Sequence, residues 1–397
     1  MGRAASGAVP QSLCQADLTD TDVLIVGGGP VGLFLGCCLA QHGIRFQLVE
    51  RQPLPSTHTK SIGIHPPALA RLAHVGVAER LIEAGVCVSC GIAFAGPAEI
   101  GRLSFTMGPG PYRFIVAIPQ HRTEALLRQR LDELAPRSFT PAAAVVAVHE
   151  DPDAVCTTLH DGQVLRSRLV VGCDGMGSQV RKSAGFHYLG AEYPDRYVMG
   201  DFDDTSGLGT AACVFLGRQG LVESFPLPGM IRRWVARDAT GNQMRDVAQL
   251  AEIIRRRTGH VVAASTASMF SPFRTFAFVA HPFARGRVLL AGDAGHVVSP
   301  IGGQGMNLGW MDVWDLVPEL VALLAGQASI EAVARRYADR RSRAYRIVRR
   351  RAEFNMWMGR EGRSSVVKQS MARLLLGTPL AAYFAARFSM RGLPDAP

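Results

Sequence analysis

The chain has 397 residues, of which 48% are hydrophobic and 19% are charged. This profile is typical of a globular protein with one large domain or two intertwined domains, and it excludes an intrinsically disordered chain. No apolar run is long enough to span a bilayer as a helix. Residues 1–20 are small and polar-leaning without a hydrophobic core, so we expect a flexible leader rather than a secretory signal, and a cytoplasmic location.

Much of the net charge of +10 lies in one predicted helix, which holds nine arginines between Arg335 and Arg351. Such a cluster fits binding to nucleic acid or to an acidic membrane. No basic motif interleaved with aromatic residues accompanies it, so we favour a solvated outer helix face, paired in part with acids such as Asp339 and Glu353. We therefore expect no nucleic-acid partner, and membrane contact is the less favoured alternative.

The eight cysteines include one C-x-x-C pair, Cys87 and Cys90, with neither a second pair nor a histidine cluster nearby. A structural metal site needs about four ligands. We therefore expect reduced cysteines and no metal site.

The stretch from Asp22 to Glu50 reads as strand, glycine-rich turn, helix and strand in order. Val23–Val26 is a short apolar run of the kind found in buried parallel strands. Leu33–Ala40 has a helical pattern, and Phe46–Val49 is a second buried strand. Because the glycines between the first strand and the helix fit G-x-G-x-x-G, the sequence predicts a dinucleotide-binding unit.

Each glycine of this turn has a physical role. Gly27 allows the tight turn from strand to helix, Gly29 lets the backbone approach a pyrophosphate, and Gly32 lets the helix pack close to the sheet. The helix N-terminus supplies free N–H groups and a positive dipole end for the phosphates. Glu50 ends the second strand, where a carboxylate can accept hydrogen bonds from a ribose diol. These features do not separate NAD from FAD.

The next part of the chain mixes helices and strands. Ala68–Ala84 is helical with a break at Gly76, and residues 86–118 read as antiparallel strands. A leucine stripe predicts a helix that begins at Gln120. From local chemistry, Gln120 is a polar residue of the cap region rather than a cofactor contact. Residues 144–171 then read as strands around a turn.

A second buried strand ends in Asp174-Gly175, and a short helix that carries Arg181 follows it. An aspartate at the carboxyl end of a strand lies on the ligand-facing edge of an open α/β sheet. Taken alone, this Asp-Gly pair is better explained as an aspartate-stabilised turn followed by a left-handed glycine.

Residues 187–280 form a block of predicted strands with one clear helix, Met244–Arg257. We interpret this block, together with residues 86–118, as a substrate-facing sheet built from two separated pieces.

A third buried strand ends in Gly292-Asp293 and leads into a glycine-rich loop, residues 299–307, that opens a helix. The loop amides form a second donor-rich helix N-terminus. Such an end could hold the pyrimidine ring of a flavin, where negative charge develops on reduction. Asp293 could accept hydrogen bonds from the ribityl hydroxyl groups. His296 is either a redox-site ligand or a packing residue, and we favour packing.

The remaining residues, Ser329–Phe354 and Ser364–Met390, are predicted to be helical. The last segment has an apolar stripe that fits docking on the body of the protein or on a partner.

Three separated motifs agree: Gly27–Arg51, Cys173–Gly175 and Gly292–Asn307. Over roughly residues 20–350, the chain resembles the single-component FAD-dependent aromatic hydroxylases of the p-hydroxybenzoate hydroxylase type. The resemblance implies an α/β fold with a doubly wound, Rossmann-like FAD-binding domain interleaved with an antiparallel-sheet substrate domain, and a helical C-terminus. The expected boundaries are 21–85, 119–186 and 281–330 for the FAD-binding domain, 86–118 and 187–280 for the substrate domain, and 331–397 for the C-terminal helices.

The same resemblance implies roles for individual residues. Those implied to bind the pyrophosphate are Gly27, Gly29 and Gly32, with Pro30 between them as a further cofactor-binding candidate. Glu50 would hold the adenosine ribose with Arg51 beside it, and Gln120 would contact the flavin, contrary to the local interpretation. Asp293 would bind the ribityl chain. The residues implied to line the isoalloxazine are Pro300, Gly302, Gly305, Met306 and Asn307. In this family, the Asp-Gly motif contacts both FAD and the transient nicotinamide cofactor. The residues that match this motif are Asp174, Gly175 and Arg181.

The chain departs from the family at two places. Lys60 stands where many relatives have arginine, which keeps the charge but loses the planar fork. Lys60 is nonetheless a cofactor-binding candidate. Asp312–Leu316 differs from the usual Asp-Ala-x-Asn-Leu ending.

The implied reaction is monooxygenation with tightly but non-covalently bound FAD, transient NADPH or NADH, and O2 as co-substrate. A C4a-hydroperoxyflavin would hydroxylate or epoxidise an aromatic, quinoid or polyketide-like small molecule of secondary metabolism. Because the chemistry belongs to the flavin, we assign no catalytic side chain. The protein is expected to be a monomer or homodimer.

Two alternatives use the same scaffold. One is a flavin-dependent reductase or halogenase, although the halogenase signature Trp-x-Trp-x-Ile-Pro is absent. The other is a non-catalytic binding protein that lost FAD, against which the intact glycines, Glu50 and Asp293 count.

Overall fold

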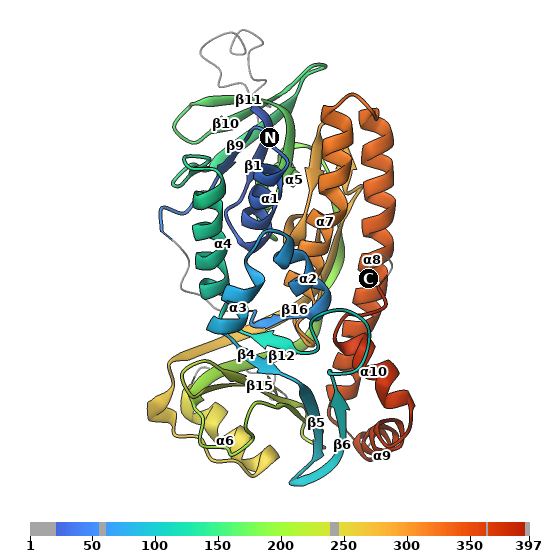
Figure 1. Ribbon diagram of the computed structural model, residues 1–397. Helices are drawn as coiled ribbons and strands as arrows, with labels where there is room; N and C mark the ends of the chain where they lie inside the picture. Colours follow the sequence, from blue (N-terminus) through green and yellow to red (C-terminus); the bar gives the residue numbers. More distant parts are fainter. Residues whose placement is uncertain (1–20, 55–60, 239–245, 363, 394–397) are drawn as a thin grey trace, which may run out of the picture.

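The computed structural model describes residues 21–54, 61–238, 246–362 and 364–393 (Figure 1). The predicted leader, residues 1–20, and the cofactor-binding candidate Lys60 lie outside the described residues. Figure 1 shows a first sheet with its helices in the upper half and a second sheet in the lower half, with the long helix α8 beside both. In the described ranges, no helix combines the length and the apolarity needed to cross a membrane.

The first sheet is built around five parallel strands in the order β18-β11-β1-β2-β8. Their bounds are Val288–Leu290 (β18), Val164–Gly172 (β11), Thr21–Val26 (β1), Phe46–Val49 (β2) and Phe139–Thr140 (β8). The antiparallel strands of this sheet are β17 (Ala284–Arg285), next to β18, and the hairpin of β9 (Val145–Glu150) and β10 (Val155–Leu159), next to β11.

Both faces of this sheet are buried, as the continuous apolar strand pattern predicts. Val23 and Ile25 of β1 point into one core, with α1 (Pro30–Gln41), α4 (Gln120–Leu134) and α7 (Gly305–Leu324). The alternate residues Leu24 and Val26 point into a second core, with residues of β9, β10 and α5 (Gln179–Ser183). The helices α2 (Pro66–His74) and α3 (Ala78–Ala84) add to the first core.

The second sheet has the strand order β19-β16-β12-β15-β14-β13-β5-β6. The central strands are β16 (Met269–His281), β12 (His187–Asp203), β15 (Ile231–Asp238), β14 (Val222–Leu227) and β13 (Ala212–Phe215). The outer strands are β19 (His296–Val297), β5 (Cys90–Ala95) and β6 (Ala98–Ser104). Three separated segments of the chain therefore contribute strands: the two expected pieces and, in addition, β19. Of the expected piece 86–118, only β5 and β6 belong to this sheet. The sheet is antiparallel as expected, except that β5 runs parallel to β13.

One face of the second sheet is covered by α6 (Val247–Thr258), which buries Leu250 and Ile254 against the sheet residues Val198, Phe202 and Trp234. In the described residues, the predicted helix Met244–Arg257 begins at Val247, where Asp246 caps the helix by accepting from the amide of Ala248. Met244 and Arg245 lie outside the described residues. A small third sheet joins β3 (Gly63–Ile64), β7 (Ile115–Ala117) and β4 (Val86–Val88).

β12 and β16 are long strands that pair along most of their length. Their register runs from His187 opposite His281 to Asp201 opposite Met269, with one irregularity between Glu192 and Arg196. Because β16 also pairs with β19, the second sheet is joined directly to the chain segment that follows β18.

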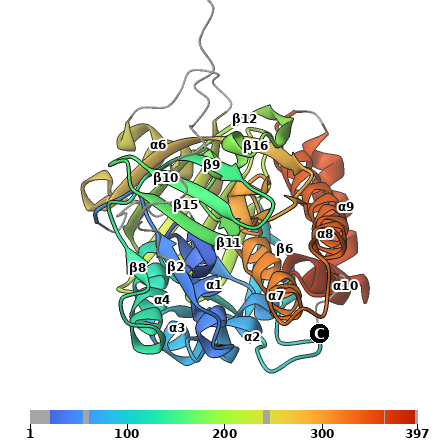
Figure 2. The same cartoon turned by 90° about the horizontal axis from the view of Figure 1, so that it is seen from above.

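The C-terminal part forms α8 (Ile330–Gly359), α9 (Ser365–Leu376) and α10 (Leu380–Phe388). Figures 1 and 2 both show α8 side by side with α7. The predicted solvated arginine face is wrong for Arg341 and Arg351, which are buried. The expected acid pairing is confirmed for Glu353, which binds Arg349 at 2.9 Å, while Arg336 and Arg340 pair with Glu319 of α7.

Candidate active site

The glycine-rich turn between β1 and α1 is closed on one side and open on the other. Gly27 has φ +110°, and a Cβ there would lie 2.5 Å from the carbonyl oxygen of Cys173. A Cβ on Gly32 would lie 2.0 Å from the carbonyl oxygen of Gly27. A Cβ on Gly29 would meet no described atom within 4 Å. The packing of the chain therefore explains Gly27 and Gly32, whereas Gly29 borders open space beside the first-turn amides of α1, which have no acceptor within the helix.

Glu50 lies directly after β2 and is fixed by two backbone amides. The N–H groups of Gly28 and Gln52 donate to its two carboxylate oxygens at 2.6 and 2.8 Å. Each carboxylate oxygen can accept more than one hydrogen bond. Glu50 can therefore accept a further donor while it stays in place, and the neighbouring Arg51 is exposed.

Gln120 is the first residue of α4 and connects two segments. Its side-chain amide donates to Glu124 at 2.8 Å and accepts from the N–H of Ser61 at 3.3 Å. Burial raises the pKa of Glu124, and the nearby charge of Glu50 raises it further. Gln120 thus links the start of α4 to the segment that follows Lys60.

Asp174 organises the start of α5. One carboxylate oxygen accepts from the amides of Gln179 and Val180 at 2.7 and 3.2 Å, and Gly175 has the left-handed φ of +76°. This agrees with the local interpretation of the Asp-Gly pair. The other oxygen, Oδ1, is buried and has no hydrogen-bond partner among the described residues. A buried polar atom without a partner is costly, so this oxygen favours an additional donor at the site.

Arg181 is buried and connects the second motif to the third. Its guanidinium donates to the carbonyl oxygens of Ala294 and Met176 at 2.8 and 2.6 Å and lies 3.6 Å from the ring centre of Tyr188. Burial lowers the pKa of Arg181. These contacts fit a positioning residue that holds the segment around the exposed Asp293, rather than a residue that reaches out to a ligand.

A buried ionic network behind Asp293 was missed by the sequence interpretation. Asp312 of α7 accepts from the Gly292 amide at 2.8 Å, from Nε2 of His296 at 2.6 Å and from Nε of Arg341 at 2.6 Å. Arg341 also binds Asp315. Burial raises the pKa of Asp312, but His296 and Arg341 outweigh this effect and hold the pKa below its usual value. The atypical segment around Asp312 therefore fastens α7 to α8 and to the end of β18.

The packing expected for His296 is confirmed. Its ring centre lies 5.7 Å from that of Phe283 and 6.2 Å from that of Tyr345, and the residue is buried. The hydrogen bond to Asp312 adds a role that the sequence did not predict. The sequence feature that could have indicated this buried network is the pair Asp312 and Asp315, which lie three residues apart and so share a helix face.

The glycine-rich loop before α7 is held by Asn307. The side chain of Asn307 accepts from the amide of His65 at 2.8 Å and donates to the carbonyl oxygens of Gly63 and Gly303 at 2.8 and 2.9 Å. Burial lowers the pKa of His65 to about 4, so this imidazole is neutral near pH 7. The side chain of Asn307 is therefore occupied by the protein, which leaves the first-turn amides of α7 as the donors of this loop.

Of the other predicted loop residues, Pro300 is exposed, Gly302 has φ +94°, and Gly305 and Met306 are half-buried in the first turn of α7.

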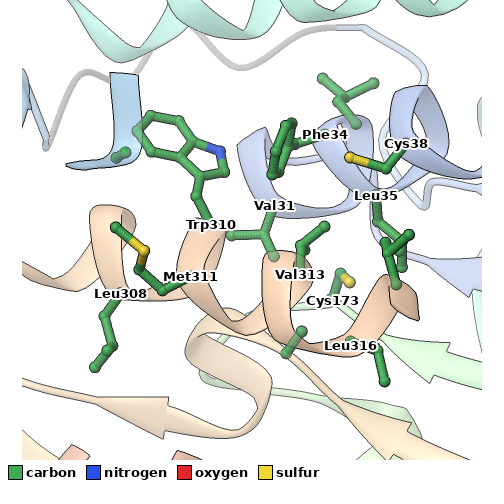
Figure 3. Packing of buried hydrophobic residues seen from close by; sticks show 14 of the residues in the cluster. Val31, Phe34, Leu35, Cys38, Cys173, Leu308, Trp310, Met311, Val313 and Leu316 are labelled. Atoms are coloured by element: carbon green, nitrogen blue, oxygen red, sulfur yellow. The ribbon is translucent and has the colours of Figure 1, made fainter. Parts of the chain in front are cut away.

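Helices α1 and α7 bring the first and third motifs together. Figure 3 shows Val31, Phe34 and Leu35 of α1 facing Trp310 and Val313 of α7. In addition, the indole N–H of Trp310 donates to the carbonyl oxygen of Pro30 at 3.0 Å. Trp310 is fully buried, and this contact sets the glycine-rich loop at a fixed position relative to the turn after β1.

The chain resembles known proteins over most of its length. The family model described as FAD binding domain matches residues 20–351. The rifampicin monooxygenase of Streptomyces venezuelae is 31% identical, with 89% of this chain and 75% of that protein covered. The pentachlorophenol 4-monooxygenase of Sphingobium chlorophenolicum is 31% identical, with 81% and 62% covered. A solved Diels-Alderase of pyrroindomycin biosynthesis has a TM-score of 0.81 at 26% identity, with 95% and 82% covered.

The match to the family model extends over all three motifs and both sheets. The expected fold is confirmed, and the chain belongs to the FAD-binding-domain family, together with FAD-dependent aromatic monooxygenases.

Proposed function

We propose that this protein is an FAD-dependent monooxygenase that uses NADPH or NADH and O2 to hydroxylate or epoxidise an aromatic, quinoid or polyketide-like small molecule. The observation that carries the proposal is the open side of the turn at Gly29, which borders free helix N–H groups and which no packing within the described chain explains. Backbone amides at a helix N-terminus bind the pyrophosphate of a dinucleotide.

The residues present fit FAD at several positions. The turn at Gly27, Gly29, Pro30 and Gly32 would hold the pyrophosphate, and Glu50 with Arg51 would hold the adenosine ribose. The unpartnered oxygen of Asp174 would accept one further hydrogen bond from the cofactor or from a water bound to it. Gln120 and Asp293 would contact the flavin and its ribityl chain. The first-turn amides at Gly305 and Met306 would donate to the flavin ring, beside Pro300, Gly302 and Asn307.

We assign the FAD-binding part to residues 21–85, 119–186 and 281–330, and the substrate-binding part to 86–118 and 187–280. The C-terminal helices, 331–397, complete this division. Lys60 and Arg181 remain candidates for binding the nicotinamide cofactor. Arg181 would act indirectly, by positioning the segment around Asp293.

When bound, FAD supplies the electron transfer and the activation of O2. The chain's own contribution is orientation and exclusion of water. Ile301 of the glycine-rich loop packs with Tyr197, Met199 and Val235 of the second sheet and with Met356 of α8. This apolar contact places the loop against the sheet and keeps water from the space between them, which protects a reactive intermediate from side reactions.

The test is an absorption spectrum of the purified protein, followed by NADPH and NADH oxidation with and without phenols and quinones. A flavin spectrum, oxidation stimulated by a panel member, and a product that carries one atom from labelled O2 are expected. A colourless protein that takes up no added FAD would overturn the proposal and favour a binding protein. A flavoprotein that consumes no O2 with any panel member would favour a non-redox activity such as that named for the Diels-Alderase, or a reductase.

A further inference from the structure

The second sheet carries a buried carboxyl group on the face that meets the glycine-rich loop. Glu223 of β14 is 5% exposed. It pairs with Val235 of β15 on one side and with Val214 of β13 on the other, and Val235 pairs in turn with Met199 of β12. Residues directly opposite each other on antiparallel strands share a face of the sheet. These four residues therefore form one row across it.

The neighbours of this row identify the face. Met199 and Val235 belong to the apolar cluster that contains Ile301 of the glycine-rich loop and Met356 of α8, and Val214 packs against that cluster. The alternate residues of β14 and β15, such as Val222 and Trp234, lie in the core under α6. Glu223 therefore points to the side of the loop and not to α6.

The charged groups that share this face are already paired. Arg233 binds Asp201 through two hydrogen bonds of 2.6 and 2.7 Å. Arg237 and Arg360 both bind Asp195, at 3.1 and 2.7 Å, and Arg237 also binds Glu361. From α9, Lys368 donates to the carbonyl oxygen of Arg360 at 3.0 Å. None of these cations is bound to Glu223.

Glu223 itself receives no hydrogen bond from any described residue, and burial raises its pKa to about 7. The hydroxyl group of Tyr197, on the same face, is buried and has no hydrogen-bond partner among the described residues. Ligand sites in proteins are mostly apolar with a few convergent polar groups, and titratable groups with shifted pKa values gather there.

The apolar residues around Glu223 suit a flat ligand. The cluster includes Met199 and Met356, and Met269 and Met358 pack against it. Methionine side chains are flexible and make favourable contacts with aromatic rings, so they can adapt to an inserted ring.

We propose that the carboxylate of Glu223 accepts a hydrogen bond from a hydroxyl group of the aromatic substrate, so that Glu223 selects phenolic or enolic substrates and orients them toward the glycine-rich loop. The inference rests on the proposed function for the kind of substrate, and its test does not depend on turnover. Tyr197 offers a second polar group on the same face of the sheet.

The experiment measures binding of matched probe pairs to the FAD-loaded protein by calorimetry, without NADPH. The pairs are 2-naphthol with 2-methoxynaphthalene, and 1-hydroxyanthraquinone with 1-methoxyanthraquinone. Wild-type protein is expected to prefer the hydroxyl probe of at least one pair. Glu223→Gln is expected to reduce this preference about tenfold, the size expected for loss of a hydrogen bond to a charged group. Glu223→Met should abolish the preference while it keeps affinity for the methyl ether.

Glu99→Gln is the matched control, since Glu99 lies on the same sheet but is exposed and paired with Arg102. It should leave the preference unchanged. Wild-type protein without a preference for either hydroxyl probe, or a preference that survives both substitutions at Glu223, overturns the inference. Selectivity that depends on Glu223, in a protein that never consumes O2, would support the inference and contradict the proposed monooxygenase activity. The two failures are therefore distinguishable.

Discussion

The carboxylate of Asp312 accepts the backbone N–H of Gly292 at 2.8 Å, although the two residues belong to different elements, α7 and the segment after β18. The same carboxylate binds Arg341 and His296, and all three side chains are buried. One side chain therefore sets the position of the segment in which Asp293 lies.

We expect Asp312→Asn to lower the free energy of unfolding by about 3 kcal/mol, because it breaks a buried ion pair and leaves Asp315 as the remaining acidic partner of Arg341. Urea denaturation of the apoprotein measures this. The control is Asp132→Asn, since the ion pair between Asp132 and Arg128 is exposed and should contribute less than about 1 kcal/mol. Equal effects of the two substitutions would contradict the role assigned to Asp312.

Two glycines of the first turn should respond differently to alanine. Gly32→Ala should destabilise the apoprotein by about 2 kcal/mol or more, because its Cβ would lie 2.0 Å from a backbone oxygen. Gly29→Ala should leave apoprotein stability nearly unchanged and weaken FAD binding, because its Cβ fills open space at φ −74°. Thermal melts and FAD titrations separate the two effects. If Gly29→Ala binds FAD like wild type, the pyrophosphate does not lie at this turn.

Glu223 should make stability fall as the pH rises. Its pKa is raised to about 7 in the folded protein, above the usual carboxyl value, so between the two values the folded state holds more protons than the unfolded state. Stability is therefore greatest below the unfolded pKa and declines up to the folded pKa. Relative to Glu223→Gln, wild type should lose about 3 kcal/mol between pH 4 and pH 8, measured by chemical denaturation at several pH values. Parallel curves for the two proteins would show that the carboxyl is not desolvated.

Arg181 should not tolerate lysine. An ammonium cannot reproduce the fork that reaches the carbonyl oxygens of Met176 and Ala294 together, and it loses the flat contact with Tyr188. We expect Arg181→Lys to cost about 2 kcal/mol of stability and to weaken FAD binding. Lys182→Arg is the control, because Lys182 is the next residue but is exposed. An unchanged FAD affinity in Arg181→Lys would separate Arg181 from the cofactor site.

The sequence was most informative where structure depends on near neighbours. The turn with Gly27, Gly29 and Gly32 and its flanking strands were predicted closely, because glycine conformation and strand pattern are local properties. The helix predicted from Leu33 begins three residues earlier, at Pro30, because proline is favoured in the first turn.

Long-range contacts escaped the sequence interpretation. Arg341 lies in a run of arginines that resembles a solvated face, and only its partner Asp312, 29 residues earlier, shows that it is buried. The parallel pairing of β5 with β13 likewise joins segments more than 100 residues apart. Glu223 carried no local signal, because the face to which a strand residue points depends on the register of its neighbours.

The pairing of β12 with β16, interrupted once between Glu192 and Arg196, has a consequence for kinetics. Their register runs from His187 opposite His281 to Asp201 opposite Met269, and β16 is hydrogen-bonded to β19, which begins three residues after Asp293. A paired ladder does not bend without breaking several hydrogen bonds at once, so the paired parts on each side of this irregularity should each move as a rigid unit. Any slow bending that limits substrate entry or product release should then take place between Glu192 and Arg196, whereas short loops and side chains relax in nanoseconds to microseconds.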